Sequence, residues 1–361
     1  MSDRLRMPQD VLHGFCVSAL AACGLSQADA HDVAAVLVFA DKRGIASHGC
    51  STLPGYVHHL RAGTLNPRPD VRLVSDTAAC AVVDGDGGLG AITAIRCARL
   101  AVEKARACGI GCVGARNSNH FGAAAYYALI MSEAGMIGEV VSTAPPVMAP
   151  TGGRGRVLGN NPYAVAVPTR DDPALVLDMA TSVAAGRKVI GAAEAGLPVP
   201  EGWLLDALGS PSTDPGDFLR GGALLPFGGH KGFGLSLVFE VLAGVLTGAG
   251  PDGPTGERTG GSPAPDGIGH LFRATDIAAF MPRDAFLDRM EGLRQRIKAA
   301  RAAPGARDVV IPGERAHAEQ TTSDRLGVPL GRETLDALAK LASILGISPL
   351  RPDTLGRGPA V

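Results

Sequence analysis

Aromatic side chains and net charge are both scarce in this chain of 361 residues. Phe, Trp and Tyr together make up 4% of it, so the chain offers few rings on which unpaired nucleobases could stack. Its 34 Lys and Arg nearly balance 35 Asp and Glu, which leaves a formal charge of -1. A chain without a basic excess lacks the field that attracts nucleic acid or an anionic membrane surface. We therefore expect neither partner.

Cysteine motifs and long apolar runs are also missing. The seven cysteines form no CxxC pair, and the isolated spacing of Cys108 and Cys112 is weak evidence for a metal site. We expect reduced thiols and no metal. The segment 1–10 lacks the apolar stretch of a secretory signal. The longest apolar run, 233–246, is interrupted by polar residues and is too short to cross a bilayer. These features predict a cytoplasmic globular protein.

What the chain does have is apolar content, at 46%, arranged in two periodicities. Helical spacing of apolar residues predicts helices over 8–24, 27–43, 53–62, 91–108, 123–134, 235–246, 283–302 and 333–346. Short apolar runs predict strands over 79–83, 110–114, 137–142, 164–167, 175–178 and 271–279. The helix over 235–246 is the most apolar, so we expect it in the core. Strands that alternate with helices indicate an α/β fold, and the Gly- and Pro-rich stretch 248–270 is expected to be a loop.

Gly85, Gly87 and Gly90 form a GxGxxG pattern between a predicted strand and a predicted helix. In a Rossmann fold such a turn holds a pyrophosphate, and an acidic residue follows about 20 positions later at the end of the next strand. Here that strand ends in Ala115 and Arg116. An arginine could pair with a 2′-phosphate, but we interpret the pattern as a tight turn in a glycine-rich protein.

Polar groups gather in four other segments. Ser47-His48-Gly49 follows a predicted helix and supplies a histidine that can exchange a proton near neutral pH. The loop 117–122 follows a strand, where α/β folds place ligands. The segment 178–182 places an acid and hydroxyls after a strand, where they either bind a cofactor or cap the next helix. In 228–234, four glycines, a histidine and a lysine begin a helix, an arrangement suited to phosphate.

In order along the chain, seven blocks resemble the malate/L-lactate dehydrogenase family of the second type, also called the sulfolactate dehydrogenase-like family. The family includes ureidoglycolate dehydrogenases, diketogulonate reductases and Δ1-piperideine-2-carboxylate reductases. The blocks are 43–49, 118–122, 159–162, 178–182, 198–206, 228–234 and 312–314.

The resemblance implies a non-Rossmann α/β fold that binds NAD or NADP, with a helical domain built from both chain ends. We therefore expect a helical domain over 1–75 plus 295–361 and a cofactor- and substrate-binding domain over 76–294. Members of the family are typically homodimers with the cofactor near the subunit interface, so a homodimer is expected here.

The resemblance also implies roles for individual residues. His48 matches the proton-transferring histidine, Ser47 matches the hydroxyl that supports it, and 85–90 matches a turn that does not hold the pyrophosphate. The residues that match cofactor contacts are His120, Phe121, Gly122, Ala123, Ala124, Asn160, Val176, Leu177, Asp178, Met179, Ala180, Thr181, Ser182, His230, Lys231, Pro312, Gly313 and Glu314.

Four positions around the expected substrate depart from the family pattern. Ala46 stands where many members have Asp, and Ala144 stands where they commonly have Asn. Thr52 replaces a basic residue that pairs with the substrate carboxylate, and its uncharged hydroxyl cannot make that charge-assisted contact. Lys188 stands where imine-reducing members place an acid. We expect Thr52 and Lys188 to lie at the substrate.

Together these segments predict an NAD(P)-dependent oxidoreductase that moves a hydride between nicotinamide and a carbonyl carbon, with His48 as proton donor or acceptor. A 2-oxo acid and its 2-hydroxy acid are the default substrate pair. If Thr52 does not hold the carboxylate, Arg43 or Arg258 is an alternative cation. The competing interpretations are a cyclic-imine or ketone reductase of secondary metabolism and a non-catalytic nucleotide-binding relative. The sequence favours neither NAD nor NADP.

Overall fold

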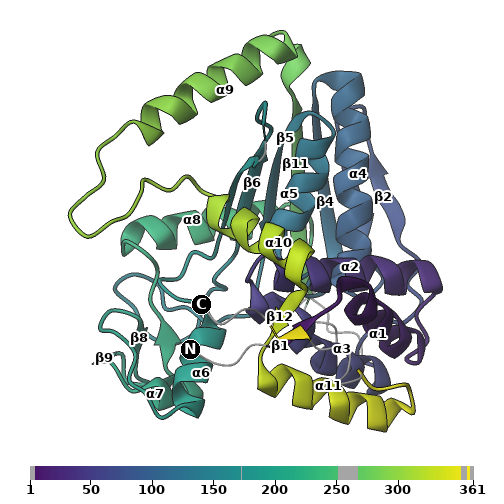
Figure 1. Ribbon diagram of the computed structural model, residues 1–361, viewed down its shortest axis with the longest axis vertical. Coiled ribbons are helices and arrows are strands. Elements are labelled where there is room, and N and C mark those ends of the chain that lie inside the picture. Colours follow the sequence, from purple (N-terminus) through teal and green to yellow (C-terminus); the bar gives the residue numbers. More distant parts are fainter. Residues whose placement is uncertain (1–4, 172, 251–266, 351–355, 358–361) are drawn as a thin grey trace.

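The computed structural model describes residues 5–171, 173–250, 267–350 and 356–357. Its centre is a mixed seven-stranded sheet (Figure 1). In spatial order the strands are β2 (Arg72–Asp76), β3 (Cys80–Asp84), β4 (Ile110–Ser118), β11 (Ile268–Asp276), β5 (Met136–Ser142), β6 (Tyr163–Val167) and β7 (Leu175–Met179). β3 and β4 run parallel, and every other neighbouring pair is antiparallel. The middle strand, β11, is the last of the seven along the chain.

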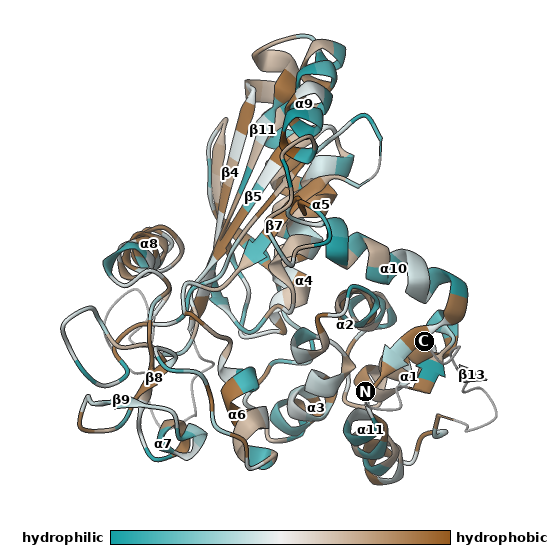
Figure 2. Ribbon diagram, turned by 60° about the vertical axis from the view of Figure 1, so that its left-hand side comes forward, coloured by the Kyte–Doolittle hydropathy of each residue, from teal (hydrophilic) through white to brown (hydrophobic). Residues whose placement is uncertain are grey.

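Helices cover both faces of this sheet, with α4 and α5 on one face and α8 and η3 across the other (Figure 2). Their bounds are α4 (Gly90–Cys108), α5 (Ala124–Glu133), α8 (His230–Glu240) and the π-helical turn η3 (Val241–Val245). A strand glycine lets α4 approach the sheet closely, since a Cβ at Gly111 would lie 2.0 Å from the carbonyl oxygen of Ala101. A side chain there would push the helix away.

Segments from both ends of the chain lie together in a helical layer beside α4 and α5 (Figure 1). The layer contains β1 (Leu5–Met7), α1 (Gln9–Ala21), α2 (Gln27–Lys42), α3 (Leu53–Arg61), α10 (Glu314–Leu326), β12 (Val328–Leu330), α11 (Arg332–Leu345) and β13 (Gly356–Arg357). β1 pairs antiparallel with both β12 and β13. Leu12, Leu37 and Leu338 of this layer belong to the same apolar core as Ile95 and Phe272. Burial of that shared core holds the chain ends on the sheet.

A small lobe lies between β7 and α8 along the chain and has its own apolar cluster, Val189, Leu204, Phe218 and Leu224. Its elements are α6 (Gly186–Glu194), β8 (Leu204–Leu205), β9 (Pro211–Ser212), α7 (Pro215–Leu219) and β10 (Ala223–Leu224). The remaining helix, α9 (Arg283–Lys298), follows β11 and buries Leu287.

The helix expected in the core over 235–246 differs from that prediction. α8 begins at His230, gives way to η3, and leaves Leu237, Val238 and Val245 exposed by 47%, 52% and 72%. Only one side of this helix packs against the sheet. Its apolar residues lie on all sides, but those on the outer side are exposed in the single chain, so the prediction of a core helix is wrong. Although α8 is apolar, no helix of the described residues is long and apolar enough to cross a membrane.

Candidate active site

A cavity of about 470 Å³ opens where the sheet, the helical layer and the small lobe meet. Its wall is mainly apolar, and its polar side chains come from segments far apart in the sequence. The lining residues are Ile45, Ser47, His48, His120, Phe121, Gly122, Ala123, Ala124, Ser142, Thr143, Ala144, Pro145, Asn160, Pro162, Asp178, Met179, Ala180, Ala185, Lys188 and Ile268. An apolar pocket with a few converging polar groups is typical of a small-molecule site.

The cavity brings together the two histidine segments, Lys188, Asn160 and 178–180. The predicted site residues that do not line it are Thr52, Val176, Leu177, Thr181, Ser182, His230, Lys231, Pro312, Gly313 and Glu314. The lining residues outside the segments that the sequence singled out are Ser142, Thr143, Pro145, Ala185 and Ile268, and Ile45 and Pro162 fall within the blocks 43–49 and 159–162 without an assigned role. Ser142 ends a predicted strand, which was the one available indication for it.

His48 lies in a 3-10 turn directly after α2, and its Nδ1 is 2.9 Å from the hydroxyl of Ser47. Its ring is stacked on that of His120, with 5.5 Å between the centroids and 28° between the planes. Burial lowers the pKa of His48 below its ordinary value. The imidazole is therefore neutral at pH 7, the state in which it can accept a proton.

His120 is fixed by a tyrosine from another element. Its Nδ1 lies 2.6 Å from the phenol oxygen of Tyr56, a buried residue of α3. Burial, together with the charge of nearby His48, lowers the pKa of His120 to about 4. Burial also raises the pKa of Tyr56. Both groups are therefore neutral at pH 7, and a phenol that donates to Nδ1 leaves the imidazole hydrogen on Nε2.

The Asp41 carboxylate supports the turn formed by Ser47, His48 and Gly49. Its side chain is buried at the end of α2, and its Oδ2 accepts a 2.7 Å hydrogen bond from the backbone N–H of Cys50. A Cβ at Gly49 would lie 2.1 Å from Asp41 Oδ1, so only glycine fits beside this carboxylate. Burial raises the pKa of Asp41 to about 6.

Asp178 is the penultimate residue of β7 and lines the cavity, and its Oδ2 accepts a 3.0 Å hydrogen bond from the backbone N–H of Ala125 in the first turn of α5. The carboxyl faces the open cavity but is enclosed by protein on its other sides. That burial raises its pKa to about 6, although the Ala125 N–H and the charge of Arg43 favour the ionised form. An acid at a helix N-terminus is also stabilised by the helix dipole.

The wall behind Phe121 rests on a fully buried histidine of β11. His270 lies between two hydroxyls, with Nδ1 2.8 Å from Ser142 Oγ and Nε2 2.9 Å from Ser118 Oγ. Its ring stacks on Phe121 at 4.4 Å and 12°. Burial lowers its pKa to about 3, so it is a neutral link between β4 and β5. No motif in the sequence indicated a role for His270.

The glycine turn 85–90 is occupied by its own chain. The N–H of Gly85 donates to the carbonyl of Arg116, and that of Gly87 donates to the carbonyl of Asn117, each at 2.9 Å. The Arg116 guanidinium pairs with Asp84 at 3.4 Å. Backbone donors that a pyrophosphate would need are already used, which favours the interpretation as a tight turn.

Of the three other residues proposed to meet a substrate carboxylate, the two that the structure describes do not line the cavity. The Thr52 hydroxyl donates to the carbonyl of Gly49 at 2.8 Å. The Arg43 guanidinium is buried and donates to Oε1 of Gln320 at 2.7 Å. Arg258 lies outside the described residues.

His230 and Lys231 are exposed at the start of α8. The segment that begins at Asp178 connects the cavity to this turn, because the Phe227 N–H donates to the carbonyl of Thr181 at 3.0 Å. A Cβ at Gly232 would lie 2.9 Å from that same carbonyl. The two segments are therefore in direct contact, although His230 and Lys231 do not line the cavity.

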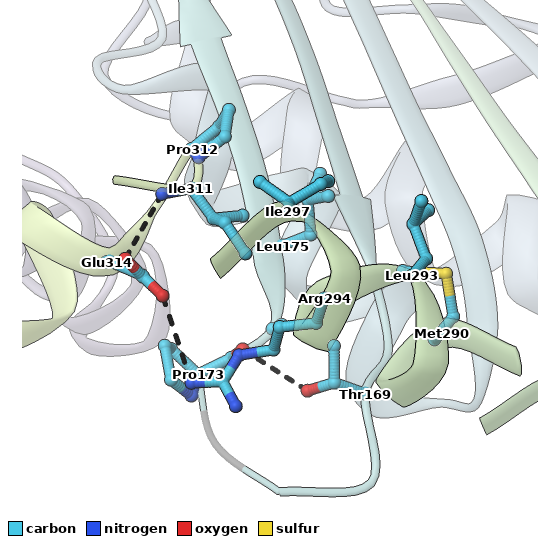
Figure 3. Close-up of a pocket in the computed structure, with 11 residues that line it drawn as sticks. Thr169, Pro173, Leu175, Met290, Leu293, Arg294, Ile297, Ile311, Pro312 and Glu314 are labelled. Carbon is cyan, nitrogen blue, oxygen red and sulfur yellow. Dashed lines mark hydrogen bonds and ion pairs between the residues drawn. The ribbon is translucent and has the colours of Figure 1, made fainter. Parts of the chain in front are cut away.

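The segment 312–314 lies beside the last strand, where the Val176 N–H donates to the carbonyl of Pro312 at 3.0 Å. A small apolar cavity of about 30 Å³ lies at this place, lined by residues of α9 and β7. Figure 3 shows the side chains that line it, Glu314 among them. The Glu314 carboxylate accepts from the Ile311 N–H at 3.1 Å and from Lys298 Nζ at 2.5 Å. It thereby joins α9 to the start of α10.

Across the described ranges, no three or more His, Cys, Asp or Glu side chains lie close enough together to hold a metal ion. The ionisable side chains that line the cavity are His48, His120, Asp178 and Lys188. Two neutral histidines, each held through Nδ1, are equipped to exchange a proton with a bound oxygen or nitrogen.

Comparison with known proteins agrees with this chemistry. A family model described as malate/L-lactate dehydrogenase matches residues 7–339. Malate dehydrogenase of Pyrococcus horikoshii is 40% identical over 96% of this chain and 97% of its own. A solved structure of that enzyme, from Pyrococcus horikoshii OT3, has a TM-score of 0.87 at 37% identity, over 97% of this chain and 98% of the other.

Two further relatives cover nearly the same length. L-sulfolactate dehydrogenase of Methanocaldococcus jannaschii is 35% identical over 92% of this chain and 95% of its own. Ureidoglycolate dehydrogenase (NAD(+)) of Escherichia coli O157:H7 is 31% identical over 92% and 93%. The mixed α/β fold and the predicted dehydrogenase class are confirmed. The resemblance inferred from the seven blocks is confirmed with them: the chain belongs to the malate/L-lactate dehydrogenase family.

Proposed function

We propose that this dehydrogenase moves a hydride between NAD or NADP and the carbon of a 2-oxo acid and 2-hydroxy acid pair, in the cavity around His48. The observation that supports this most directly is the stacked pair of His48 and His120, two neutral imidazoles in the wall of a mainly apolar cavity. Such a cavity limits water around the reacting atoms while a side chain exchanges the proton.

The cavity wall has the right composition for a flat nicotinamide ring. Its small side chains leave room for a planar group: Gly122, Ala123, Ala124, Ala144, Ala180 and Ala185. Asp178 and Asn160 are the polar side chains that would hold the amide and sugar groups of the cofactor. The bound dinucleotide supplies the hydride, which no amino-acid side chain can provide.

The two histidines act on the proton and the oxygen of the substrate. With its Nδ1–H donating to Ser47 Oγ, His48 accepts the hydroxyl proton of a 2-hydroxy acid at Nε2, and in reduction the same atom returns a proton to the oxygen. The bond between Nδ1 and Ser47 keeps the ring in that orientation. His120, with Nδ1 taken by Tyr56, presents Nε2–H as a donor to the same oxygen.

The predicted cofactor residues outside the cavity wall are proposed to hold the rest of the dinucleotide. They are Val176, Leu177, Thr181, Ser182, His230, Lys231, Pro312, Gly313 and Glu314. Contact between Thr181 and the turn before α8, and between Val176 and Pro312, supports a continuous binding surface. We also infer a binding mode unlike that of a Rossmann fold, and a functional division into 1–75 plus 295–361 and 76–294.

Absorbance at 340 nm tests the reaction. Purified protein is given NADH or NADPH with 2-oxo acids, neutral ketones and cyclic imines. Oxidation of cofactor with 2-oxo acids, and its loss in His48→Ala, is the expected result. Turnover of cyclic imines alone would favour the imine-reductase alternative, and no turnover with any class would overturn the proposal.

A homodimer is proposed as well, with α8 and η3 as part of the interface. The outward residues there are apolar and exposed: Leu235, Leu237, Val238, Val241, Val245 and Leu246. The hydropathy colouring shows this helix as an apolar element on the outer side of the sheet (Figure 2). An apolar patch of this kind on one helix is typical of a subunit interface.

Light scattering after size exclusion tests the interface. Val238→Asp is expected to convert the dimer to a monomer, because a carboxylate would be buried between apolar surfaces. Leu208→Asp is the control, since Leu208 is 77% exposed but lies in the small lobe. A monomeric wild type, or dissociation by both variants, would count against α8.

We also propose a cytoplasmic location. All seven cysteines are free, and the Sγ atoms of Cys16 and Cys50 lie 3.6 Å apart without a bond. Unpaired thiols are typical of a reducing compartment. If intact cells are treated rapidly with an alkylating reagent, the cysteines of this protein should be recovered as alkylated thiols and not as disulfides.

A further inference from the structure

Lys188 is the one Lys or Arg among the described residues that line the cavity. It lies in the first turn of α6, next to Val189, which is fully buried in the core of the small lobe. That anchor fixes which side of the helix Lys188 occupies. No ion pair or hydrogen bond within the described part of the chain engages its ammonium group.

The other groups that could have supplied a positive charge are engaged elsewhere or uncharged. Thr52 is uncharged and bonds to its own turn. The buried Arg43 guanidinium does not line the cavity: its Nη1 donates to Gln320, its charge acts on Asp178, and its Nε has no hydrogen-bond partner among the described residues. His48 and His120 are neutral at pH 7, because burial lowers their pKa values. A negatively charged ligand in this cavity therefore has one permanent counter-charge available in its wall, at Lys188.

We propose that Lys188 binds the carboxylate of the substrate and makes the enzyme selective for small 2-oxo and 2-hydroxy acids over neutral ketones. The inference rests on the proposed function and adds the residue that selects for its substrate class. Lys188 is exposed on the open side of the cavity, so its ammonium stays hydrated until the substrate arrives, and pairing costs little desolvation. A lysine contacts one carboxylate oxygen as a point charge rather than gripping both, as an arginine does.

The same charge acts against the imine alternative. An imine is reduced by hydride through its protonated iminium form, which is a cation. A permanent positive charge in the wall repels a cation while it attracts a carboxylate. Lys188 thus favours a neutral carbonyl beside a carboxylate as the acceptor.

Equilibrium binding separates this inference from the proposed reaction. Oxamate, a carboxylate that resembles a 2-oxo acid but accepts no hydride, is titrated into the NADH-loaded protein by calorimetry. Lys188→Met is expected to weaken the binding of oxamate about 10- to 100-fold, the range for loss of a charge-assisted hydrogen bond. Lys188→Glu should weaken it further. NADH affinity, followed by its fluorescence, is expected to stay within about twofold.

Arg187→Met is the matched control, because Arg187 is the preceding residue of α6, is exposed, and does not line the cavity. It should bind oxamate as the wild type does. Kinetics give a second measurement, since Lys188→Met should raise KM for pyruvate but leave KM for its neutral methyl ester nearly unchanged. Equal weakening by Arg187→Met, or unchanged oxamate binding in Lys188→Met, would overturn the inference. Absence of turnover with every 2-oxo acid in the wild type, while oxamate binding still depends on Lys188, would instead reject the proposed reaction.

Discussion

The phenol of Tyr56 and the imidazole of His120 share a 2.6 Å hydrogen bond across 64 positions of sequence. Tyr56 does not line the cavity, whereas His120 does. Because the imidazole is neutral at pH 7, this hydrogen bond couples its tautomer to the phenol, and a phenol that donates to Nδ1 leaves the hydrogen on Nε2. A residue outside the wall is thus linked to whether His120 donates or accepts toward a ligand.

Tyr56→Phe removes the hydrogen bond to His120 Nδ1, so the tautomer of that ring is no longer fixed. This variant should lower kcat about 10-fold, with little effect on cofactor affinity. Steady-state rates and NADH fluorescence titration measure the two quantities separately. If cofactor affinity fell while kcat did not, Tyr56 would have a role in binding rather than in orienting His120.

His48→Ala should bind cofactor normally and lose roughly 10²- to 10⁴-fold in turnover, the usual range for removal of a positioned acid or base. Unchanged turnover would move the proton-transfer role to another group, with His120 the first to examine.

The two reaction directions should respond to pH with opposite signs. The pKa of His48 lies below its ordinary value, and oxidation needs the neutral ring. Oxidation should therefore gain speed as pH rises through that pKa and then level off, whereas reduction should slow over the same interval. Parallel pH profiles of kcat/KM check this, and two profiles of the same sign would contradict it.

Substitutions at Gly87 and Lys231 should have different effects, the first on the stability of the fold and the second on cofactor binding. Gly87 has φ +66°, so Gly87→Ala is expected to destabilise the fold by about 1–2 kcal/mol through strain in the left-handed region, with normal NADH affinity. Lys231→Ala should weaken NADH without changing the unfolding midpoint. Denaturant unfolding and cofactor titration of both variants are the measurements, and a weakened NADH complex in Gly87→Ala would restore the glycine turn as a phosphate site.

Asp41 should make the fold less stable as pH rises. Its pKa is about 6 in the folded protein against about 3.8 when unfolded, so the folded state holds more protons between those values. Stability is then lost as pH rises through this window, by up to about 3 kcal/mol. Asp41→Asn cannot ionise, so its unfolding temperature relative to wild type should improve between pH 4.5 and pH 7.5. If the difference in unfolding temperature between Asp41→Asn and the wild type stayed constant with pH, ionisation of Asp41 would not be the cause.

The sequence was sufficient for elements with strong patterns and for blocks that are local in the chain. It was not sufficient for β2, whose five residues are all exposed, or for α10, whose sequence ERAHAEQTTSDRL has almost no apolar periodicity. α6 begins at a glycine and buries Val189 alone, so its pattern was weak as well. Each of these elements owes its structure to neighbours rather than to its own periodicity.

The candidate site divides in the same way. Ser47, His48 and His120 line one cavity, and each lies in a segment with a local signal in the sequence: a hydroxyl beside a histidine, or a polar loop after a strand. Asp41 and Tyr56 were not found, because a buried acid and a buried tyrosine within helices are indistinguishable from structural residues until the fold brings them to the histidines. Thr52 was expected at the substrate because it replaces a basic residue of the family pattern, but its hydroxyl bonds back to Gly49 and it does not line the cavity.

The order of the strands bears on how the protein is made. β11 pairs with β4 on one side and β5 on the other, yet it begins only at Ile268. Until the ribosome has released that strand, β2–β4 and β5–β7 can exist only as two separate half-sheets, each with an open edge that can pair with other chains. A nascent or truncated chain that stops before Ile268 should therefore aggregate, and a supplied β11 peptide should compete for both edges.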